Sequence, residues 1–156
     1  MKWMIGAASA LAVALVAQHI GAHGEHVHSL KNPDDPIGAR MYLMENVGAN
    51  AKQLKAKLDA GQIADAALYA GAIALHASQM SSLFPPDSIS DASRAKPEIW
   101  QQWDGFMQAA HGLRDAAEDL GHAASQDRGD EAKAKLKAVF GSCKSCHDTF
   151  RKPKES

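Results

Sequence analysis

The chain has 156 residues, the size of one domain with a single hydrophobic core. Its 17 basic and 18 acidic residues give a net charge of −1, which argues against a nucleic-acid partner because such a partner requires a strongly basic surface. The sequence contains no internal repeat and no nucleotide-binding glycine loop, which disfavours repeat architectures and nucleotide-dependent enzymes.

The first 22 residues resemble a secretory signal peptide. Lys2 supplies a positive charge, an apolar run covers residues 4–17, and small residues follow, so cleavage is expected after Ala22 or Gly24. The apolar run is short for a membrane span, and an uncleaved anchor is the alternative interpretation. In a bacterium this leader would direct the protein to the periplasm.

Residues 23–33 form a polar segment that contains His23, His26 and His28. A histidine cluster can bind a metal ion. We favour a flexible tail, because segments next to a terminus or a cleavage site are commonly mobile. A single domain is then expected over residues 34–152.

The first two helices are expected on either side of Gly61. Asp35 is a candidate N-cap and Pro36 suits the first helical position, so the first helix should run to about Ala60. Its apolar face consists of Ile37, Met41, Met44, Ala51, Leu54 and Leu58. The second helix, rich in alanine, should run from Ile63 to about Phe84, where two prolines end it. The loop over residues 85–96 is the longest in the chain, and loops of this length are often functional.

Two more helices are expected in the second half. Pro97 should begin a third helix, a short turn follows at residues 126–129, and Asp130 is expected to cap a fourth helix that ends before Pro153. Four helices with mostly short connections predict an all-α, antiparallel four-helix bundle.

The only two cysteines lie three residues apart on the last helix, and a histidine follows the second. Cys143, Cys146 and His147 form the C-x-x-C-H spacing at which c-type haem is attached. Two thiols add to the vinyl groups of the porphyrin, and the adjacent imidazole binds iron. On a helix the three side chains fall within an arc of about 100° and continue the apolar face, so the haem should be buried between the helices.

Other interpretations of this motif fit less well. A thioredoxin-like site would follow a strand, and no strand pattern is present. A structural zinc site needs four ligands, and a disulfide would leave the histidine unexplained. A haem-free helical protein that uses the two thiols, or binds metal with the histidine-rich segment, remains the alternative from another functional class.

The position of the motif, on the last of four helices, resembles the class II c-type cytochromes and in particular the cytochrome c′ family. The resemblance covers roughly residues 34–151. Three stretches carry it: residues 40–46, residues 96–100 and residues 143–151.

The resemblance implies roles for the residues of the motif and for a cation that follows it. Cys143 and Cys146 would carry the thioether bonds of one haem c, and His147 would be the axial iron ligand. Arg151, one turn beyond the histidine, matches a basic residue that lies beside the proximal imidazole in the family. A solvated cation at the end of a helix is the alternative for Arg151.

Further roles are implied outside the motif. Arg40 matches an arginine that approaches a haem propionate, although Met41 stands where the family often has glutamine. Ser88 matches a hydroxyl residue near the haem edge. Trp100 and Trp103 would either stack against that edge or belong to the core.

Met44 occupies the position that faces the sixth coordination site of the iron in this family. An apolar residue there blocks the site without binding, which leaves a five-coordinate iron open to small gases such as nitric oxide or carbon monoxide. In low-spin members a methionine of this helix is the sixth ligand. A thioether can serve either purpose, and we favour the blocking role.

The resemblance therefore implies a periplasmic haem protein, not an enzyme, that transfers electrons with a periplasmic redox partner protein and binds small gases. The alternative within the family is a low-spin electron carrier with His147 and Met44 both bound to iron. Family members often pair through their first two helices, so a homodimer is possible here.

Overall fold

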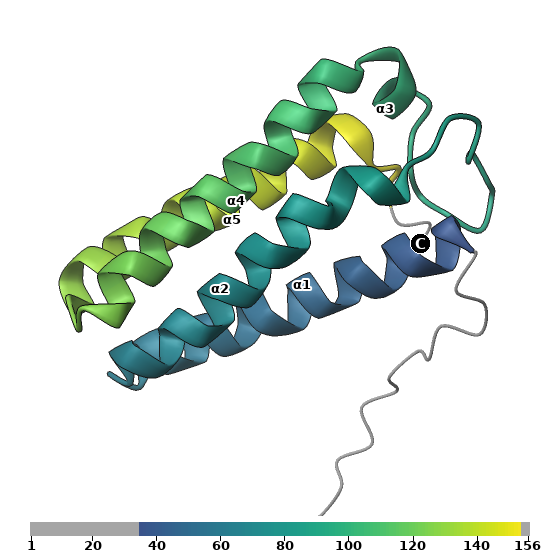
Figure 1. The fold of residues 1–156 in the computed structure, drawn as a ribbon. Coiled ribbons are helices and arrows are strands. Elements are labelled where there is room, and N and C mark those ends of the chain that lie inside the picture. The colour runs from purple at the N-terminus through teal and green to yellow at the C-terminus, as the bar shows by residue number, and fades with distance from the viewer. Residues whose placement is uncertain (1–34, 154–156) are drawn as a thin grey trace, which may run out of the picture.

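The structure is a computed structural model that describes residues 35–153, so the predicted signal peptide and the histidine-containing segment lie outside the described residues. The described chain is helical (Figure 1). Its elements are α1 (Pro36–Asp59), α2 (Ile63–Gln79), the 3-10 helix η1 (Met80–Leu83), α3 (Glu98–Gln101), α4 (Trp103–Ser125) and α5 (Gly129–Phe150).

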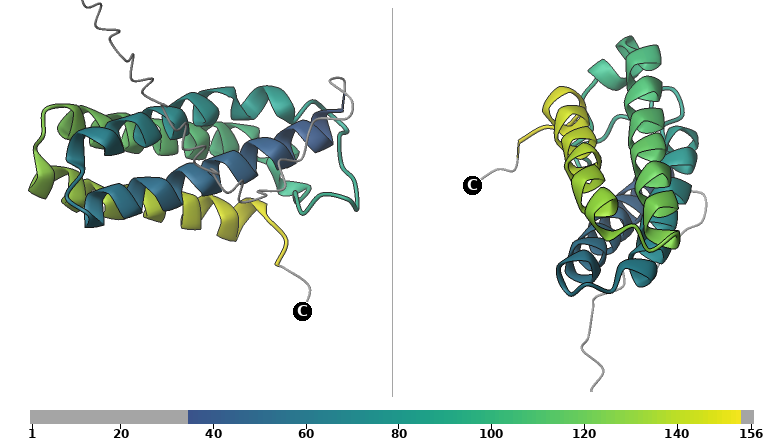
Figure 2. Two further views of the ribbon diagram at one scale, coloured as in Figure 1. Left: turned by 90° about the horizontal axis from the view of Figure 1, so that it is seen from below. Right: turned by 90° about the vertical axis from the view of Figure 1, so that its left-hand side faces the viewer.

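The four long helices α1, α2, α4 and α5 lie side by side along one axis, with the short α3 and its loop at one end (Figure 2). This arrangement confirms the predicted all-α four-helix bundle. Helix α2 packs extensively on α4, α4 on α5, and α1 on α2, whereas α1 and α5 touch at few points. The bundle is thus loosest between α1 and α5. In the described residues, no helix is long and apolar enough to cross a membrane.

Helix α1 begins and ends as its sequence predicts. The Asp35 side chain accepts a hydrogen bond from the backbone N–H of Ile37 at 2.9 Å, and Pro36 is the first helical residue. Gly61 has a φ of +72°, the left-handed conformation that commonly ends helices. Of the predicted apolar face, Leu54 and Leu58 are fully buried, while Met41 is exposed.

Three predicted boundaries are wrong. Helix α2 ends at Gln79, and the last residues before the prolines form η1 instead. The helix predicted from Pro97 is interrupted at Gln102, whose non-helical backbone (φ −123°, ψ 47°) separates α3 from α4. Asp130 is not the cap of α5, because Arg128 holds that position without a side-chain hydrogen bond. Asp130 lies in the first turn, where a carboxylate still interacts favourably with the helix dipole.

Small side chains allow α2 and α4 to approach closely. Ala66, Ala70 and Ala117 are fully buried, and a Cβ placed at Gly121 would lie 3.4 Å from the Cβ of Ala70. Larger side chains fill the rest of the core, and the most completely buried of them are Leu54, Leu58, Ile73, Ile99, Leu120 and Val139. Tight packing on the α2–α4 side contrasts with the open α1–α5 side.

The segment before α3 is joined to the end of α5 by backbone hydrogen bonds. The Lys96 N–H donates to the Phe150 carbonyl at 3.0 Å, and the Lys152 N–H donates to the Arg94 carbonyl at 2.7 Å. The Lys96 ammonium also donates to the carbonyls of Asp148 and Thr149, both at 3.1 Å, at the negative end of the helix dipole. We call residues 94–96 and 150–152 the clamp.

Candidate haem site

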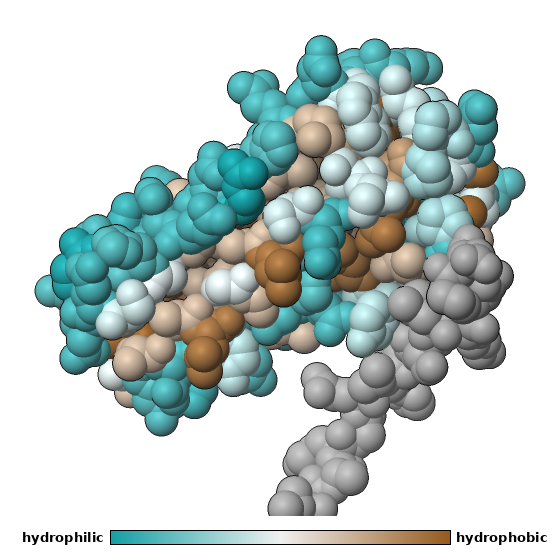
Figure 3. Space-filling view, viewed as in Figure 1, coloured by the Kyte–Doolittle hydropathy of each residue, from teal (hydrophilic) through white to brown (hydrophobic). Residues whose placement is uncertain are grey.

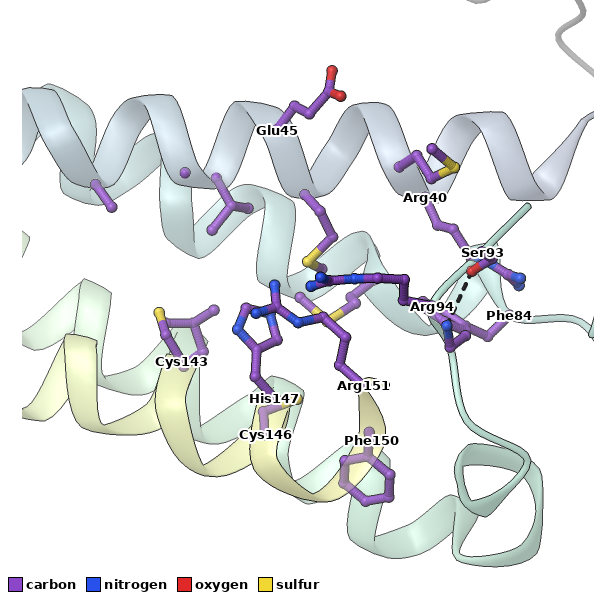
Figure 4. A pocket seen from close by; sticks show the side chains of 18 of the residues that line it. Arg40, Glu45, Phe84, Ser93, Arg94, Cys143, Cys146, His147, Phe150 and Arg151 are labelled. Atoms are coloured by element: carbon purple, nitrogen blue, oxygen red, sulfur yellow. Dashed lines mark hydrogen bonds between the residues drawn. The ribbon is translucent and has the colours of Figure 1, made fainter. Parts of the chain in front are cut away.

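The motif predicted to attach haem lies on the inner side of α5, near its C-terminal end. Cys143, Cys146 and His147 are each half-buried, and all three line one cavity (Figure 4). Neither cysteine forms a disulfide. Because the three residues lie on one helical face, their side chains can reach the same ligand.

The cavity has a volume of about 810 Å³ and is lined by side chains from α1 and α5, the two helices that barely touch, together with α4 and the segment before α3. This size falls in the range of sites that bury a cofactor or drug-sized ligand, roughly 300–1,000 Å³. Its apolar lining is Met41, Met44, Val47, Ala51, Met80, Phe84, Ala92, Ala95, Ile99, Phe106, Leu113, Phe140 and Phe150. A large, flat, apolar group therefore suits the cavity.

Basic residues outnumber acidic residues in the lining of the cavity. Three arginines, Arg40, Arg94 and Arg151, line the cavity, and in the described chain the one acidic residue of the lining is Glu45. Glu45 is exposed and points away from the cavity in Figure 4. A ligand that is apolar over most of its surface and carries carboxylates would match this donor set. Haem, with its porphyrin ring and two propionates, has this chemistry.

Arg40 is the most completely buried charged residue of the site, with 2% of its surface exposed. Its guanidinium donates to the Ser88 hydroxyl at 3.0 Å and to the Ser88 carbonyl at 2.8 Å, and it stacks over the Phe84 ring at 4.9 Å. Its Nε has no hydrogen-bond partner in the described residues. Burial lowers the pKa of Arg40, with Asp35 acting in the opposite direction. Such a cation with a spare donor is suited to an anionic group of the ligand.

These contacts predict that Arg40 joins α1 to the loop that follows η1. Arg40→Met should lower the free energy of unfolding of the haem-loaded protein by about 2 kcal/mol, since hydrogen bonds from a charged donor and a cation–π contact are both lost. The variant also avoids the desolvation cost of burying a charged guanidinium, which offsets part of that loss. Urea unfolding measures the change. Arg114→Met, which removes an arginine paired at the surface of α4, is the control and should change stability by less than about 0.5 kcal/mol. An Arg40 variant as stable as wild type would contradict this role.

The ionisable groups of the motif are shifted toward their neutral forms. Burial raises the pKa of the Cys143 and Cys146 thiols, and each shift favours the protonated thiol. Burial lowers the pKa of His147, and the nearby Arg151 and Arg94 lower it further. A neutral imidazole is the form that binds a metal.

The structure brings most of the predicted residues together. Met44 lines the cavity from α1, opposite the α5 residues. Arg151 also lines it, but lies just after α5 in extended backbone, not within the helix as the sequence suggested. Ser88 is outside the lining and accepts the hydrogen bonds of Arg40.

The two tryptophans do not line the cavity. The Trp100 indole donates to the carbonyls of Phe84 and Pro85 at 3.3 and 2.9 Å, and Trp103 is 37% exposed. Four phenylalanines supply the aromatic lining instead, namely Phe84, Phe106, Phe140 and Phe150.

Arg94 is the functional candidate that sequence reasoning missed. It lies two residues before the stretch at residues 96–100 that carries the family resemblance, in the long loop expected to be functional. Only the clamp, a tertiary contact, shows that this loop reaches the cavity.

Comparison with known proteins agrees with this site. The family model described as Cytochrome C′ matches residues 35–151. Cytochrome c′ of Pararhodospirillum photometricum is 32% identical over 124 residues, covering 77% of this chain and 98% of that protein.

Solved structures share the fold. A cytochrome c′ with an unusual ligand-controlled dimer dissociation superposes with a TM-score of 0.70 at 29% identity, covering 78% of this chain and 98% of that one. A nitric oxide complex of a variant cytochrome c′ from Alcaligenes xylosoxidans superposes with a TM-score of 0.69 at 24% identity, covering 81% and 100%. The family match over nearly all of the described residues, together with a cavity that contains the C-x-x-C-H motif, identifies this chain as a member of the cytochrome c′ family, a protein with covalently bound haem c.

Proposed function

We propose that this protein is a periplasmic electron-transfer haem protein that binds small gases such as nitric oxide or carbon monoxide, and that it is not an enzyme. The observation that carries the proposal is the convergence of the two thiols, the imidazole and three arginines on one apolar cavity. The nitric oxide complex of the Alcaligenes xylosoxidans relative supports the gas ligand. The resemblance of residues 1–22 to a signal peptide supports the location.

Haem supplies an iron that changes oxidation state by one electron and can bind a gas at an open coordination position. The residues of this chain attach, orient and enclose it. Cys143 and Cys146 would form the thioether bonds, and His147, held neutral by burial, would bind the iron. Arg40 would direct its spare Nε donor to a propionate.

Met44 would close the remaining side of the site. Its side chain is partly buried against the core and lines the cavity from α1, whereas the motif lines it from α5. Since methionine is flexible and apolar, it would exclude water and polar ligands while yielding to a small neutral gas. Ligation of iron by its thioether is the alternative, and it would produce a low-spin electron carrier.

Helix α2 presents an apolar surface that a second copy of the chain would cover. Leu68 and Leu75, two turns apart, are 75% and 58% exposed, and a brown and tan band runs along α2 in Figure 3. We therefore expect a homodimer. Leu68→Glu combined with Leu75→Glu should give monomers in sedimentation velocity, whereas Ala134→Glu on α5 should leave the dimer intact. A monomeric wild-type protein would contradict the dimer.

Two measurements on the protein purified from a periplasmic extract test the proposal. Haem staining of a denaturing gel should show a stained band, because thioether bonds survive denaturation. Mass spectrometry should show the mass of one haem added to a chain that lacks the leader. An unstained protein of apo mass would favour the haem-free dithiol or metal-binding alternative.

A further inference from the structure

The side chain of Arg94 enters the cavity from the loop that precedes α3. It extends from the loop before α3 into the space between α1 and α5, near His147 and Arg151 (Figure 4). In the part of the chain that the structure describes, this side chain makes no hydrogen bond and no ion pair. A half-buried guanidinium of this kind gains most from an anionic ligand, because its five N–H donors would otherwise lose water without replacement.

The clamp fixes the backbone of Arg94 relative to the haem-attachment helix. The Arg94 carbonyl accepts from the Lys152 N–H, and Ala95 pairs with Arg151 in an isolated antiparallel bridge. Ser93, which is buried, accepts from the Ala95 N–H at 3.2 Å and stiffens the same turn. Arg94 is therefore held at a set position beside the motif although it lies about fifty residues earlier in the chain.

The neighbouring charges also favour an anion at this point. Arg94 and Arg151 both line the cavity, and Figure 4 shows their side chains close together beside His147, so two positive charges meet there. The one acidic residue of the described lining, Glu45, points away from the cavity. A carboxylate between the two guanidinium groups would relieve this repulsion.

We propose that Arg94 binds one of the two haem propionates, and that the clamp sets its position relative to α5. This inference rests on the proposed function. Arg40, anchored by Ser88, would serve the other propionate. Arg94 suits the role better than Arg151, because Arg151 is exposed and would lose more side-chain freedom on binding. A planar guanidinium can engage a carboxylate through two parallel hydrogen bonds.

The test compares Arg94→Gln, Arg94→Met and Arg94→Lys with wild type in the haem-loaded protein. Two readouts are used: the reduction potential, and the propionate bending bands in the resonance Raman spectrum. A cation near the haem favours the ferrous state, so Arg94→Gln should lower the equilibrium constant for reduction about tenfold, which is 59 mV for one electron. A propionate band should shift in both charge-removing variants, and Arg94→Lys should restore most of the potential. Arg114→Gln, remote from the cavity, should match wild type in both readouts.

Haem staining separates failure of the proposed function from failure of the Arg94 inference. An unstained wild-type protein would refute the proposed function before Arg94 is tested. With haem attached, unchanged propionate bands in both charge-removing variants would overturn the inference. A fall in the reduction potential alone would not rescue it, because the charge of Arg94 can act on the haem through space without touching a propionate. Arg94→Met keeps the apolar stem of the side chain, so it provides the same comparison if Arg94→Gln folds poorly.

Discussion

Replacing both cysteines of the motif, as Cys143→Ser with Cys146→Ser, is expected to abolish covalently bound haem completely. A serine hydroxyl does not add to the porphyrin vinyl groups, so no thioether bond can form. Both thiols line the cavity that also contains His147, and no other cysteine in the chain could replace them. Haem staining of denatured protein, followed by intact mass, measures the loss.

The control lies between the two cysteines. Ser145 is exposed, and its hydroxyl donates to the Ser142 carbonyl within the helix, so Ser145→Ala should retain the full haem mass. Each single cysteine variant should keep at most one thioether bond. A stained band from the double variant would show that haem is attached elsewhere.

Shortening Met44 to alanine is expected to speed carbon monoxide binding to the ferrous protein by roughly tenfold to hundredfold. Displacing a well-packed side chain costs about 1–3 kcal/mol, and each 1.36 kcal/mol removed from a barrier gives about a tenfold change in rate. Met44 packs against the core and lines the cavity, so its truncation opens space where the gas would bind. Flash photolysis or stopped-flow mixing measures the rate.

Met44→Leu distinguishes blocking from ligation. Leucine fills nearly the same volume but has no sulfur, so a blocking role predicts a carbon monoxide binding rate close to that of wild type. A ligating thioether predicts instead that Met44→Leu binds the gas much faster, because the bond to iron is gone. Equal acceleration by leucine and alanine would therefore contradict the blocking role.

The sequence predicted helix ends and helix faces best where they depend on residues close together in the chain. The Asp35 cap, Gly61 and the apolar face between them predict α1 almost to the residue. The cysteine spacing predicts which face of α5 meets the cavity. These features depend on residues within one or two turns of each other.

Other features depend on contacts between distant segments, and the sequence did not reveal them. The interruption at Gln102 lets α3 and α4 take separate directions, although no proline or glycine marks it. Arg94 reaches the cavity through hydrogen bonds to residues 150–152, which no local periodicity encodes. The pairing of Arg40 with Ser88 likewise joins residues 48 positions apart in the chain.

Arg40 and Ser88 also show how an implied role can be refined by geometry. The family resemblance implies that both lie near the haem, yet only Arg40 lines the cavity. Two of the Arg40 donors are used to hold the loop, which leaves Nε for the ligand. Ser88 is therefore expected to act on the haem indirectly, by positioning Arg40.

The optical spectrum of the ferric protein, with carbon monoxide and nitric oxide added to the ferrous form, tests the central claim most directly. The account predicts a five-coordinate, high-spin ferric spectrum and a ferrous form that binds both gases. A low-spin ferric spectrum with a methionine-to-iron charge-transfer band would contradict it, because it would place the Met44 sulfur on the iron.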